Sequence, residues 1–516
     1  MTATLVSHSP PPSRQRILFR PAQPLRRHTL QALAGRVSVP GYDVRALTPA
    51  VVHLGVGAFH RAHQAVYFDR LAELGERGWG LVGSGLRSRR VGDDLGAQQG
   101  LYTVVERGRE APKPRVIGVM QRYIYAPHHQ APLLQAMADP RTRMVTLTIT
   151  AGAYGGQLGH RRTGTAFDYL VEALRLRKAA GLPGFTVVSC DNLPDNGAAA
   201  RDCVLGAAEM RDPRLANWIS ENVSFPTSMV DRITPAPDSR LALELRRQHG
   251  VYDRCPVATE TFTQWVIEDS FCNGRPPLDA VGVQFVTDAL PFVRAKMNLL
   301  NGSHCAIGFF GHALGHITSA EAMRDRLVSE AVARLMAEVT PSLTQAPDLH
   351  LPSYQRAVVD RLADAAVADP IARLCQRGSI RIGNYILPSL NAALAKGHPC
   401  QLLLFVIAAW LHYLRTQDGA AGGLLDPRDS QLCSLARLGG DDPRPALAVT
   451  SVFGDLGSHE PSVWELRRSL RDIRMRGMAA ALSSFTPPQP RMQSDRGLLP
   501  TGPGRLPRHQ TYQIGA

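Results

Sequence analysis

The sequence predicts an α/β domain with a mostly parallel sheet, followed by an all-α domain. Two observations lead to this fold class. Between about residues 50 and 290, short β-branched runs alternate with helical stretches, which is typical of a parallel sheet covered on both faces. From about residue 291 onward these runs disappear, and long segments rich in Ala, Leu and Arg replace them.

The individual elements follow from the apolar periodicity. Short β-branched runs predict strands at 51–54, 80–83, 102–106, 116–120, 144–150 and 185–189. Helical stretches at 63–74 and 166–180 separate several of them. Later in the chain we expect helices over 303–316, 320–338, 354–375, 400–415 and 462–482. The longest apolar run, residues 402–411, has about half the length that a bilayer requires, so it predicts a buried helix.

Composition divides the chain into four parts. Residues 1–40 predict a flexible basic N-terminal extension, and residues 487–516 predict a disordered tail rich in Pro and Arg, because both lack hydrophobic periodicity. Between them we expect the α/β domain over 41–290 and the helical domain over 291–486. The net charge of +14 lies largely in the two terminal segments rather than on one folded face. No nucleic-acid partner is therefore expected.

The cysteines and the N-terminus bear on location. Eight Cys are scattered without a CxxC pair, which is typical of reduced thiols in the cytosol. The first residues lack the apolar segment of a secretory signal, although their Arg and Ser content leaves a transit peptide open. We expect a cytoplasmic protein without a membrane partner.

A glycine-containing turn follows the first predicted strand, in VVHLGVGAFHRAHQ (51–64). Gly55 and Gly57 would let backbone N–H groups approach a pyrophosphate at a helix N-terminus. The third glycine of the usual fingerprint is absent, since His60 occupies its position. A second strand follows about 25 residues later, which favours a Rossmann-type dinucleotide site over a purely structural turn.

The residues at the end of that second strand bear on whether the nucleotide is NAD or NADP. A carboxylate there would accept hydrogen bonds from the adenosine ribose, but this chain has Arg87, Ser88, Arg89 and Arg90. Guanidinium groups suit bidentate contacts to phosphate. The segment is either a solvated basic loop or a site that prefers NADP over NAD, and we favour the second interpretation.

A second constellation is KMNLLNGSH (296–304). On a regular α-helix, Lys296, Asn301 and His304 would lie at about 0°, 140° and 80° around the axis, within one broad face. A lysine of depressed pKa can take an alcohol proton, an amide can stabilise the alkoxide, and a histidine can hold a neighbouring hydroxyl. The alternative is a helix with one surface lysine and capping polar groups.

Two further segments carry polar groups near the predicted sheet. SCDNLPDNG (189–197) follows a strand, so Asn192 lies at the carboxyl edge, where it is either a second oxyanion donor or part of a turn. FPTSMVDRITP (225–235) holds Asp231 within an apolar segment. The histidines form no metal-ligand pattern: His312 and His316 are four apart, but no HExxH glutamate accompanies them. No metal is expected.

These segments, in this order, resemble the polyol-specific long-chain dehydrogenases, the mannitol 2-dehydrogenase and fructuronate reductase family. The resemblance rests on GVGAFHRAHQ (55–64), SCDNLPDNG (189–197), SMVDRITP (228–235) with TFTQWVIED (261–269), and KMNLLNGSH (296–304). It spans roughly residues 40–485. It implies a zinc-independent oxidoreductase with a Rossmann-type N-terminal domain, an all-α C-terminal domain and a substrate cleft between them.

The resemblance also implies residue roles. Lys296 would be the general base, and Asn192 and Asn301 the oxyanion pair. His304 and Asp231 would bind or orient the substrate. Arg373 falls on a substrate-binding arginine, while Arg381 stands where a lysine is more usual. In the first segment the expected cofactor-binding residues are Gly55, Gly57, Phe59, His60 and Arg61.

The chain departs from the family near the lysine. Ala151 and Val293 replace glutamates, and Asn298 replaces an arginine. Losing two carboxylates disfavours the charged form of Lys296, so we hypothesise that it stays neutral over a wider pH range and releases its proton by another path.

The expected function is the NAD(P)-dependent interconversion of D-mannitol and D-fructose, with NADP favoured. Arg373 and Arg381 keep a fructuronate or tagaturonate reductase open as an alternative. A catalytically silent sugar- or nucleotide-binding homologue is the alternative from another class, motivated by the lost acids. The partner expected is a small molecule, and the protein is expected to be a monomer or a weak homo-oligomer.

Overall fold

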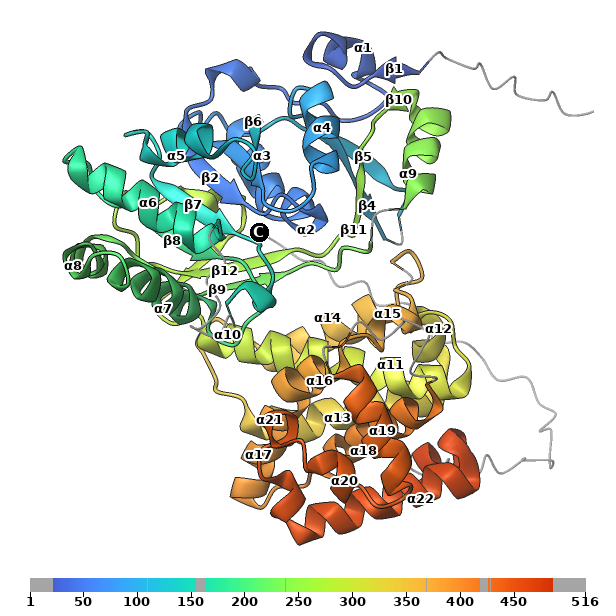
Figure 1. Cartoon of the computed structure of the whole chain (residues 1–516). Coiled ribbons are helices and arrows are strands. Elements are labelled where there is room, and N and C mark those ends of the chain that lie inside the picture. Colours follow the sequence, from blue (N-terminus) through green and yellow to red (C-terminus); the bar gives the residue numbers. More distant parts are fainter. Residues whose placement is uncertain are drawn as a thin grey trace, which may run out of the picture.

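The computed structural model describes residues 22–108, 110–154, 164–236, 238–367, 369–417, 426 and 428–485. Within this part an α/β body is followed by a helical body, and the chain passes from one to the other at α10 (Leu290–Ala295) (Figure 1). The predicted fold class, a Rossmann-type domain followed by an all-α domain, is confirmed.

The central sheet has five strands in the order β6–β3–β2–β7–β8, and every neighbouring pair is parallel. Their bounds are Met120–Tyr125, Gly80–Gly85, Pro49–Leu54, Met144–Leu147 and Thr186–Ser189, in that order. This order, with the first strand in the middle, is that of a dinucleotide-binding Rossmann sheet. The crevice for a nucleotide therefore lies at the carboxyl end of β2, where the connections turn to opposite sides.

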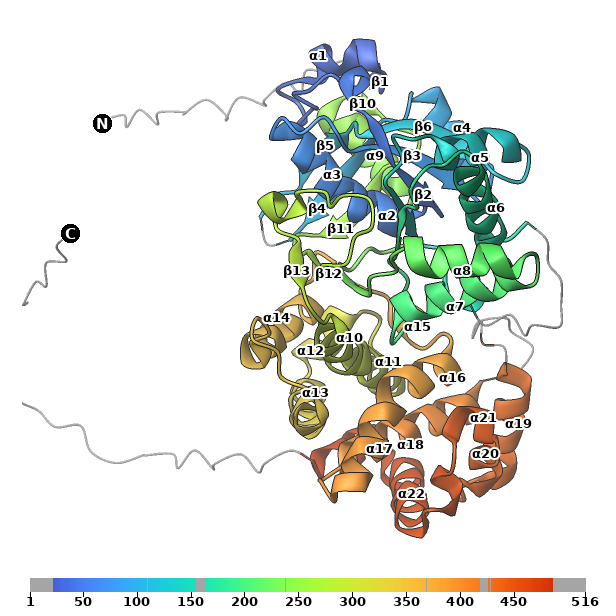
Figure 2. The same cartoon turned by 90° about the vertical axis from the view of Figure 1, so that its left-hand side faces the viewer.

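Helices cover both faces of this sheet. Val51 of β2 packs in one cluster with Phe68 of α3, and Val52 packs in another with Leu170 of α6. Figure 2 shows α3 on one side of the central strands and α5 and α6 on the other. The helices are α2 (Ala58–Ala62), α3 (Gln64–Glu73), α4 (Arg90–Ala97), α5 (Gln130–Ala138), α6 (Ala166–Ala179), α7 (Asn196–Glu209) and α8 (Pro213–Asn222). Because adjacent residues of β2 face opposite layers, its apolar run is continuous rather than alternating.

Three smaller sheets complete the α/β body. One joins β11 (Val257–Glu260), β4 (Tyr102–Arg107) and β5 (Lys113–Ile117), and another joins β13 (Gln284–Val286), β12 (Gln264–Glu268) and β9 (Ser228–Asp231). The third pairs β1 (Gln23–Pro24) with β10 (Val251–Tyr252). The connecting elements are η2 (Val44–Ala46), η3 (Ala151–Ala153), α9 (Ser239–Glu244), η4 (Leu245–His249) and η5 (Leu278–Val281). Figure 1 shows β9 and β12 directly above α10, which brings the end of β9 close to the helical body.

The helical body has one large apolar core around α18 (Gln401–Thr416), whose residues 402–411 are all buried as the apolar run predicted. No helix among the described residues is long and apolar enough to cross a membrane. The elements after α10 are η6 (Lys296–Asn301), α11 (Gly302–Leu314), α12 (Ser319–Arg324), α13 (Arg326–Val339), η7 (Thr340–Ser342), α14 (Leu351–Leu362), α15 (Ile371–Leu374), α16 (Gly378–Arg381), η8 (Ile382–Ile386), α17 (Leu387–Lys396), α18, α19 (Asp429–Gly439), α20 (Arg444–Leu447), α21 (Thr450–Phe453), η9 (Leu456–Ser458) and α22 (Glu460–Ser483).

Three expectations about elements are wrong. The predicted strand at 116–120 is the end of β5 and the first residue of β6, which belong to different sheets. The predicted helix at 320–338 is divided into α12 and α13, because the Asp325 side chain caps a new helix there. The predicted helix at 354–375 is divided into α14 and α15, and Pro370 precedes the second.

The expected flexible extension over residues 1–40 is wrong for residues 22–40. This stretch forms β1, η1 (Arg27–Thr29) and α1 (Leu30–Leu33). Leu25, Leu33 and Val37 are buried in one apolar cluster with Val251. Their burial stabilises the segment against the α/β body although its sequence shows no periodicity. The first 21 residues and the tail expected at 487–516 lie outside the described residues.

Candidate active site

Lys296 begins the π-helical segment η6 and contacts the α/β body. Its Nζ donates a hydrogen bond to Asn192 Oδ1 at 2.5 Å. Removal from solvent lowers the pKa of Lys296 to about 8, while the charge of Asp231 acts in the opposite direction and that of Arg361 in the same one. A lysine of this kind exists in both protonation states near neutral pH, as a general acid or base requires.

Asn192 follows β8 at the carboxyl edge of the central sheet, as its segment predicted. Its Nδ2 donates a hydrogen bond to Tyr385 Oη at 2.5 Å. Tyr385 belongs to η8 in the helical body, 193 residues further along the chain. Sequence reasoning missed Tyr385, because no motif surrounds it and its partner is distant along the chain.

Asn301 and His304 lie on the same segment as Lys296, but not on one regular helix. Residues 296–301 are π-helical, and α11 begins only at Gly302, so the angles expected from an α-helix do not apply. Asn301 Nδ2 and His304 Nε2 are buried and have no hydrogen-bond partner within the described part of the chain. Burial holds the pKa of His304 well below its usual value, so the ring is neutral. Both side chains are available to a polar ligand.

Asp231, expected to bind or orient the substrate, is part of a buried ion pair between the two bodies. Arg361 of α14 donates to both of its carboxylate oxygens, at 2.7 and 2.8 Å, and Tyr354 Oη donates to Oδ2 at 3.1 Å. Burial would raise the pKa of Asp231, but the charge of Arg361 holds it below its usual value. Asp231 therefore acts on Lys296 through its charge, and its lone pairs are used by Arg361 and Tyr354.

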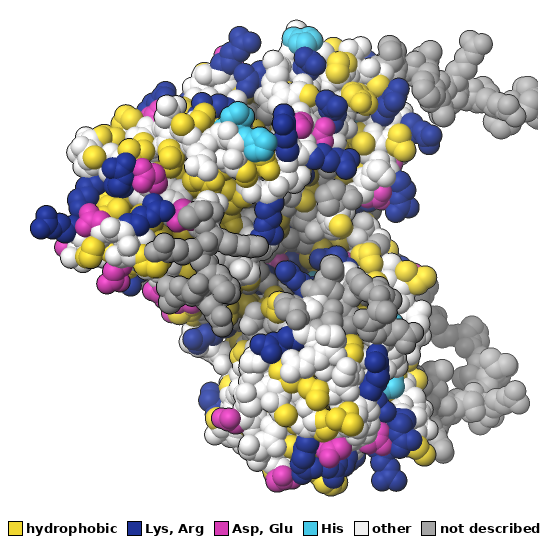
Figure 3. Space-filling model, in the orientation of Figure 1, with side chains coloured by type: hydrophobic (Ala, Val, Ile, Leu, Met, Phe, Trp, Pro, Cys, Tyr) yellow, Lys and Arg dark blue, Asp and Glu magenta, His cyan; other side chains and the backbone are white. Residues whose placement is uncertain are grey.

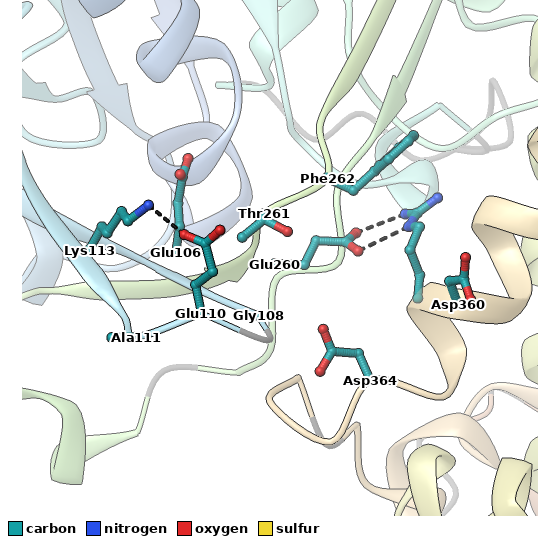
Figure 4. Close-up of a pocket in the computed structure, with 11 residues that line it drawn as sticks. Glu106, Gly108, Glu110, Ala111, Lys113, Glu260, Thr261, Phe262, Asp360 and Asp364 are labelled. Carbon is teal, nitrogen blue, oxygen red and sulfur yellow. Dashed lines mark hydrogen bonds and ion pairs between the residues drawn. The ribbon is translucent and has the colours of Figure 1, made fainter. Parts of the chain in front are cut away.

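Arg361 also binds Glu260 at the end of β11, with two hydrogen bonds of 2.8 and 2.9 Å. Its guanidinium carbon lies 3.9 Å from the ring centroid of Phe262. Figure 4 shows Glu260 and Phe262 beside a cavity of about 450 Å³, into which Asp360 and Asp364 come from the helical body. The sequence missed this set, because its members come from three segments without a shared motif.

The two candidate substrate arginines already have protein partners. Arg373 Nε donates to Asp369 Oδ1 at 2.5 Å, and a second guanidinium nitrogen contacts Oδ2 of the same carboxylate. Arg381 Nη1 donates to the backbone oxygen of Leu374 at 3.1 Å. The charge of Arg373 is thus balanced within the protein, which reduces its attraction for a substrate carboxylate.

Gly55 shapes the turn at the end of β2. Its φ is +101°, and a Cβ built there would lie 2.2 Å from the backbone oxygen of Thr148, so only glycine fits. Thr148 Oγ1 donates to Gly55 O at 2.7 Å and is bound by His53 Nε2 at 2.9 Å. Gly57 then caps α2 as an exposed residue. This cradle at the sheet's crevice fits a dinucleotide, with the backbone of Gly55 and Gly57 next to the pyrophosphate.

The residues after Gly57 lie differently from expectation. His60 is fully buried and stacks on His53, with ring centroids 3.4 Å apart. Arg61 is 3% exposed, and its guanidinium donates to the backbone oxygens of Gly57 and Cys255. Both side chains are buried and packed against protein groups, so neither is exposed to a cofactor at the Gly55 turn. Phe59 is half-buried and stacks on His63.

The basic segment follows β3 directly, beside the nucleotide crevice. Residues 87–90 are all exposed. Arg87 Nη2 donates to Thr150 Oγ1 at 3.3 Å, and Arg89 Nε donates to Asp93 at 3.3 Å. Because β3 and β7 flank β2, the contact from Arg87 to Thr150 crosses the carboxyl end of β2. Arg89 and Arg90 follow β3, the strand whose carboxyl end carries the ribose-binding residue in many dinucleotide folds.

The loop after β7 is strained. Thr150 has a φ of +76°, which a β-branched residue rarely adopts. Asp191 holds this conformation, because its carboxylate accepts hydrogen bonds from the backbone of Ile149 and Thr150 at 3.0 and 2.7 Å.

The two positions where glutamates are replaced lie in different surroundings. Ala151 lies in η3, while Val293 is buried in the helical core. Val293 is thus an apolar residue in apolar surroundings.

The two bodies enclose a hollow, which Figure 3 shows with Lys or Arg side chains in it. In the described ranges, no group of three or more His, Cys, Asp or Glu side chains is arranged to hold a metal ion. The end of β8, η6 and the start of α11 together supply a lysine of lowered pKa, two amides and a neutral imidazole. Such a set suits proton transfer and alkoxide stabilisation at a hydroxylated carbon.

Two protein-family models match the chain. The mannitol dehydrogenase Rossmann domain matches residues 49–280, and the mannitol dehydrogenase C-terminal domain matches residues 288–474. The chain is similar to the mannitol 2-dehydrogenase of Neosartorya fischeri, with 37% identity over 479 residues that cover 87% of this chain and 95% of the relative. It is also similar to that of Cereibacter sphaeroides, with 38% identity over 473 residues, 87% of this chain and 98% of the relative.

Solved structures agree with these matches. The chain is similar to Pseudomonas fluorescens mannitol 2-dehydrogenase in ternary complex with NAD and D-mannitol, with a TM-score of 0.82 and 36% identity, covering 90% of this chain and 99% of that one. It is also similar to D-sorbitol dehydrogenase in substrate-free form, with a TM-score of 0.78 and 32% identity, covering 89% and 100%.

Proposed function

The chain belongs to the mannitol dehydrogenase family and is a polyol dehydrogenase with a nicotinamide-binding Rossmann domain, and on this premise we propose that it interconverts D-mannitol and D-fructose. The observation that carries this proposal is the hydrogen bond from Lys296 Nζ to Asn192 Oδ1, at the meeting point of the two bodies. It brings a titratable base to the carboxyl edge of the nucleotide-binding sheet.

The polar residues around Lys296 have separate roles in alcohol oxidation. Neutral Lys296 takes the proton of the hydroxyl group while the C–H bond of the same carbon breaks. A bound nicotinamide would supply the acceptor for that hydrogen and its electron pair, and would leave in its reduced form. The proton goes to Lys296 and the carbon product is a ketone, so charge and atoms balance. In ketose reduction Lys296 returns the proton.

The amides stabilise the charge that develops on the substrate oxygen. Asn301 Nδ2 has no partner among the described residues, and Asn192 Nδ2 keeps one hydrogen after donating to Tyr385. Two N–H groups can therefore converge on an alkoxide. His304 Nε2 also lacks a partner in the described part of the chain, so it is available to a neighbouring hydroxyl of the sugar chain.

A polyol suits this site better than a sugar acid. Arg373, which would attract a substrate carboxylate, is paired with Asp369, and Arg381 donates to a backbone oxygen. The groups left free are neutral amides and an imidazole, which match hydroxyl groups. We therefore propose mannitol rather than a fructuronate-type substrate.

We propose NADP as the preferred cofactor. Arg89 and Arg90 are exposed at the end of β3, where many dinucleotide sites place a ribose-binding carboxylate. A 2′-phosphate would form charge-assisted hydrogen bonds with them. We also propose a cytoplasmic protein that is a monomer or a weak homo-oligomer, because its cysteines form no disulfide among the described residues and the Lys296 site is assembled within one chain. Sedimentation of the purified protein tests the oligomeric state.

One assay tests the substrate and the cofactor together. The change in absorbance at about 340 nm is followed with NADPH and NADH, each combined with fructose, fructuronate, tagaturonate and xylulose. We expect turnover with fructose and a higher kcat/KM for NADPH, and loss of turnover in Lys296→Met. Turnover confined to the sugar acids would overturn the substrate. A preference for NADH would overturn the cofactor assignment and leave the enzyme assignment intact.

A further inference from the structure

Tyr385 lies where two π-helical segments meet. It belongs to η8, which packs against η6, the segment that carries Lys296 and Asn301. A Cβ placed on Gly302, just after η6, would be 3.5 Å from the backbone oxygen of Tyr385. The two backbones therefore pack closely here, and Tyr385 is 9% exposed. Its hydroxyl nevertheless reaches Asn192 in the other body.

The Tyr385 hydroxyl determines which end of the Asn192 amide faces the lysine. A charged lysine has three donors and no acceptor, so it needs the amide oxygen. The opposite end, Nδ2, then requires an acceptor of its own, which Tyr385 Oη provides at 2.5 Å. Two short hydrogen bonds thus hold both ends of one amide, in the exposed bend that follows β8.

Few other groups control Lys296 here. The charges of Asp231 and Arg361 act on Lys296, and these two side chains form an ion pair with each other. His63 and His304 also interact with Lys296, but burial keeps both imidazoles neutral. The positions of the two missing glutamates hold Ala151 and Val293. The Asn192 oxygen is the acceptor that the described residues offer to Lys296 Nζ, so its placement matters more than in a site that also holds free carboxylates.

Building on the proposed function, we propose that Tyr385 is a positioning residue for the proton-transfer step: its hydroxyl holds the Asn192 amide so that the oxygen faces Lys296 and one N–H faces the reacting oxygen of the substrate. It acts through Asn192. Its ring contributes only packing.

The test compares Tyr385→Phe with Tyr413→Phe, a control that removes the hydroxyl of another buried tyrosine of the helical body. In Tyr385→Phe we expect kcat for mannitol oxidation to fall by about tenfold, the equivalent of one lost hydrogen bond, with KM for the cofactor unchanged. The Asn192 oxygen stabilises the ammonium form of Lys296. When Tyr385 no longer holds that oxygen in place, the ionisation of Lys296 in the kcat/KM profile should therefore move to lower pH. A role in packing alone would lower the melting temperature and leave this ionisation in place, which would overturn the proposal.

A double-mutant cycle tests the route through Asn192. If Tyr385 acts through that amide, Asn192→Ala with Tyr385→Phe is no slower than Asn192→Ala alone. Additive losses would overturn the proposal, because they would mean that Tyr385 acts independently of Asn192.

A further measurement does not depend on turnover, so it separates this proposal from the proposed function. The rate at which an amine-reactive reagent labels Lys296, followed by peptide mass spectrometry across pH, reports the lysine pKa in enzyme without substrate. We expect the labelling curve of Tyr385→Phe to move to lower pH and that of Tyr413→Phe to match the wild type. Identical curves for Tyr385→Phe and the wild type would overturn the positioning role, whether or not mannitol is the substrate.

Discussion

Arg361 donates two hydrogen bonds to Asp231, at 2.7 and 2.8 Å, across the boundary between the two bodies of the molecule. Both side chains are buried, with exposed fractions of 6% and 2%. The same guanidinium binds Glu260, so one cation from α14 is shared by two carboxylates of the α/β body. This ion pair lies next to Lys296 and connects the stability of the domain interface with the charge around the base.

Arg361→Gln should destabilise the protein strongly, because it leaves two buried carboxylates without a cation. We expect the free energy of unfolding to fall by about 3–5 kcal/mol. Urea unfolding followed by circular dichroism measures this change. Arg356→Gln is the control, since Arg356 lies on the same helix but is exposed, and should cost about 0.5 kcal/mol or less. Equal effects of the two substitutions would mean that the ion pair contributes no net stability.

The activity should follow the ionisation of Lys296, whose pKa burial lowers to about 8. Oxidation requires the neutral amine, so its kcat/KM should rise with pH and level off above that value. Reduction requires the ammonium form and should fall over the same range. Initial rates in both directions between about pH 6 and 10 give the profiles. A profile for oxidation without an ionisation below about pH 9 would contradict both this prediction and the hypothesis of a more readily neutralised lysine.

Gly55→Ala should abolish cofactor binding, because the Cβ would lie 2.2 Å from Thr148 O and φ is +101°. The loss is measured as quenching of protein fluorescence by NADPH. Gly96→Ala on α4 has open space around its Cβ and should bind NADPH as the wild type does. Binding by Gly55→Ala within about twofold of the wild type would show that the turn is not the pyrophosphate site.

Arg89→Ala together with Arg90→Ala should reduce the preference for NADPH. Each lost contact to a 2′-phosphate corresponds to about a tenfold decrease in kcat/KM for NADPH, with little change for NADH. The ratio of the two kcat/KM values is the measurement. Arg141→Ala is the matched control. Arg141 is exposed and precedes β7, so it lies at the amino end of the sheet's strands rather than at the carboxyl end. An unchanged ratio would assign residues 87–90 to a solvated loop.

Local patterns were sufficient for the fold class and for much of the candidate site. The strand at 51–54, the Gly55 turn and the position of Asn192 after a strand depend on nearest neighbours, through a short continuous apolar run and a φ that only glycine adopts readily. Lys296, Asn301 and His304 were singled out because they share one short segment. Their geometry was not predicted correctly, because the π-helical turn of η6 forms where it packs against η8.

The sequence by itself determined which residues form the sheet, where the nucleotide turn lies and which polar side chains stand near the carboxyl edge. Only the tertiary structure decided that Asp231 is neutralised by Arg361, that His60 and Arg61 are buried beneath the turn, and that Tyr385 meets Asn192 across 193 residues. The physical reason is that secondary structure follows from short-range sterics and periodicity. Burial, and hence pKa and hydrogen-bond partners, depends on surfaces that meet only when distant segments pack.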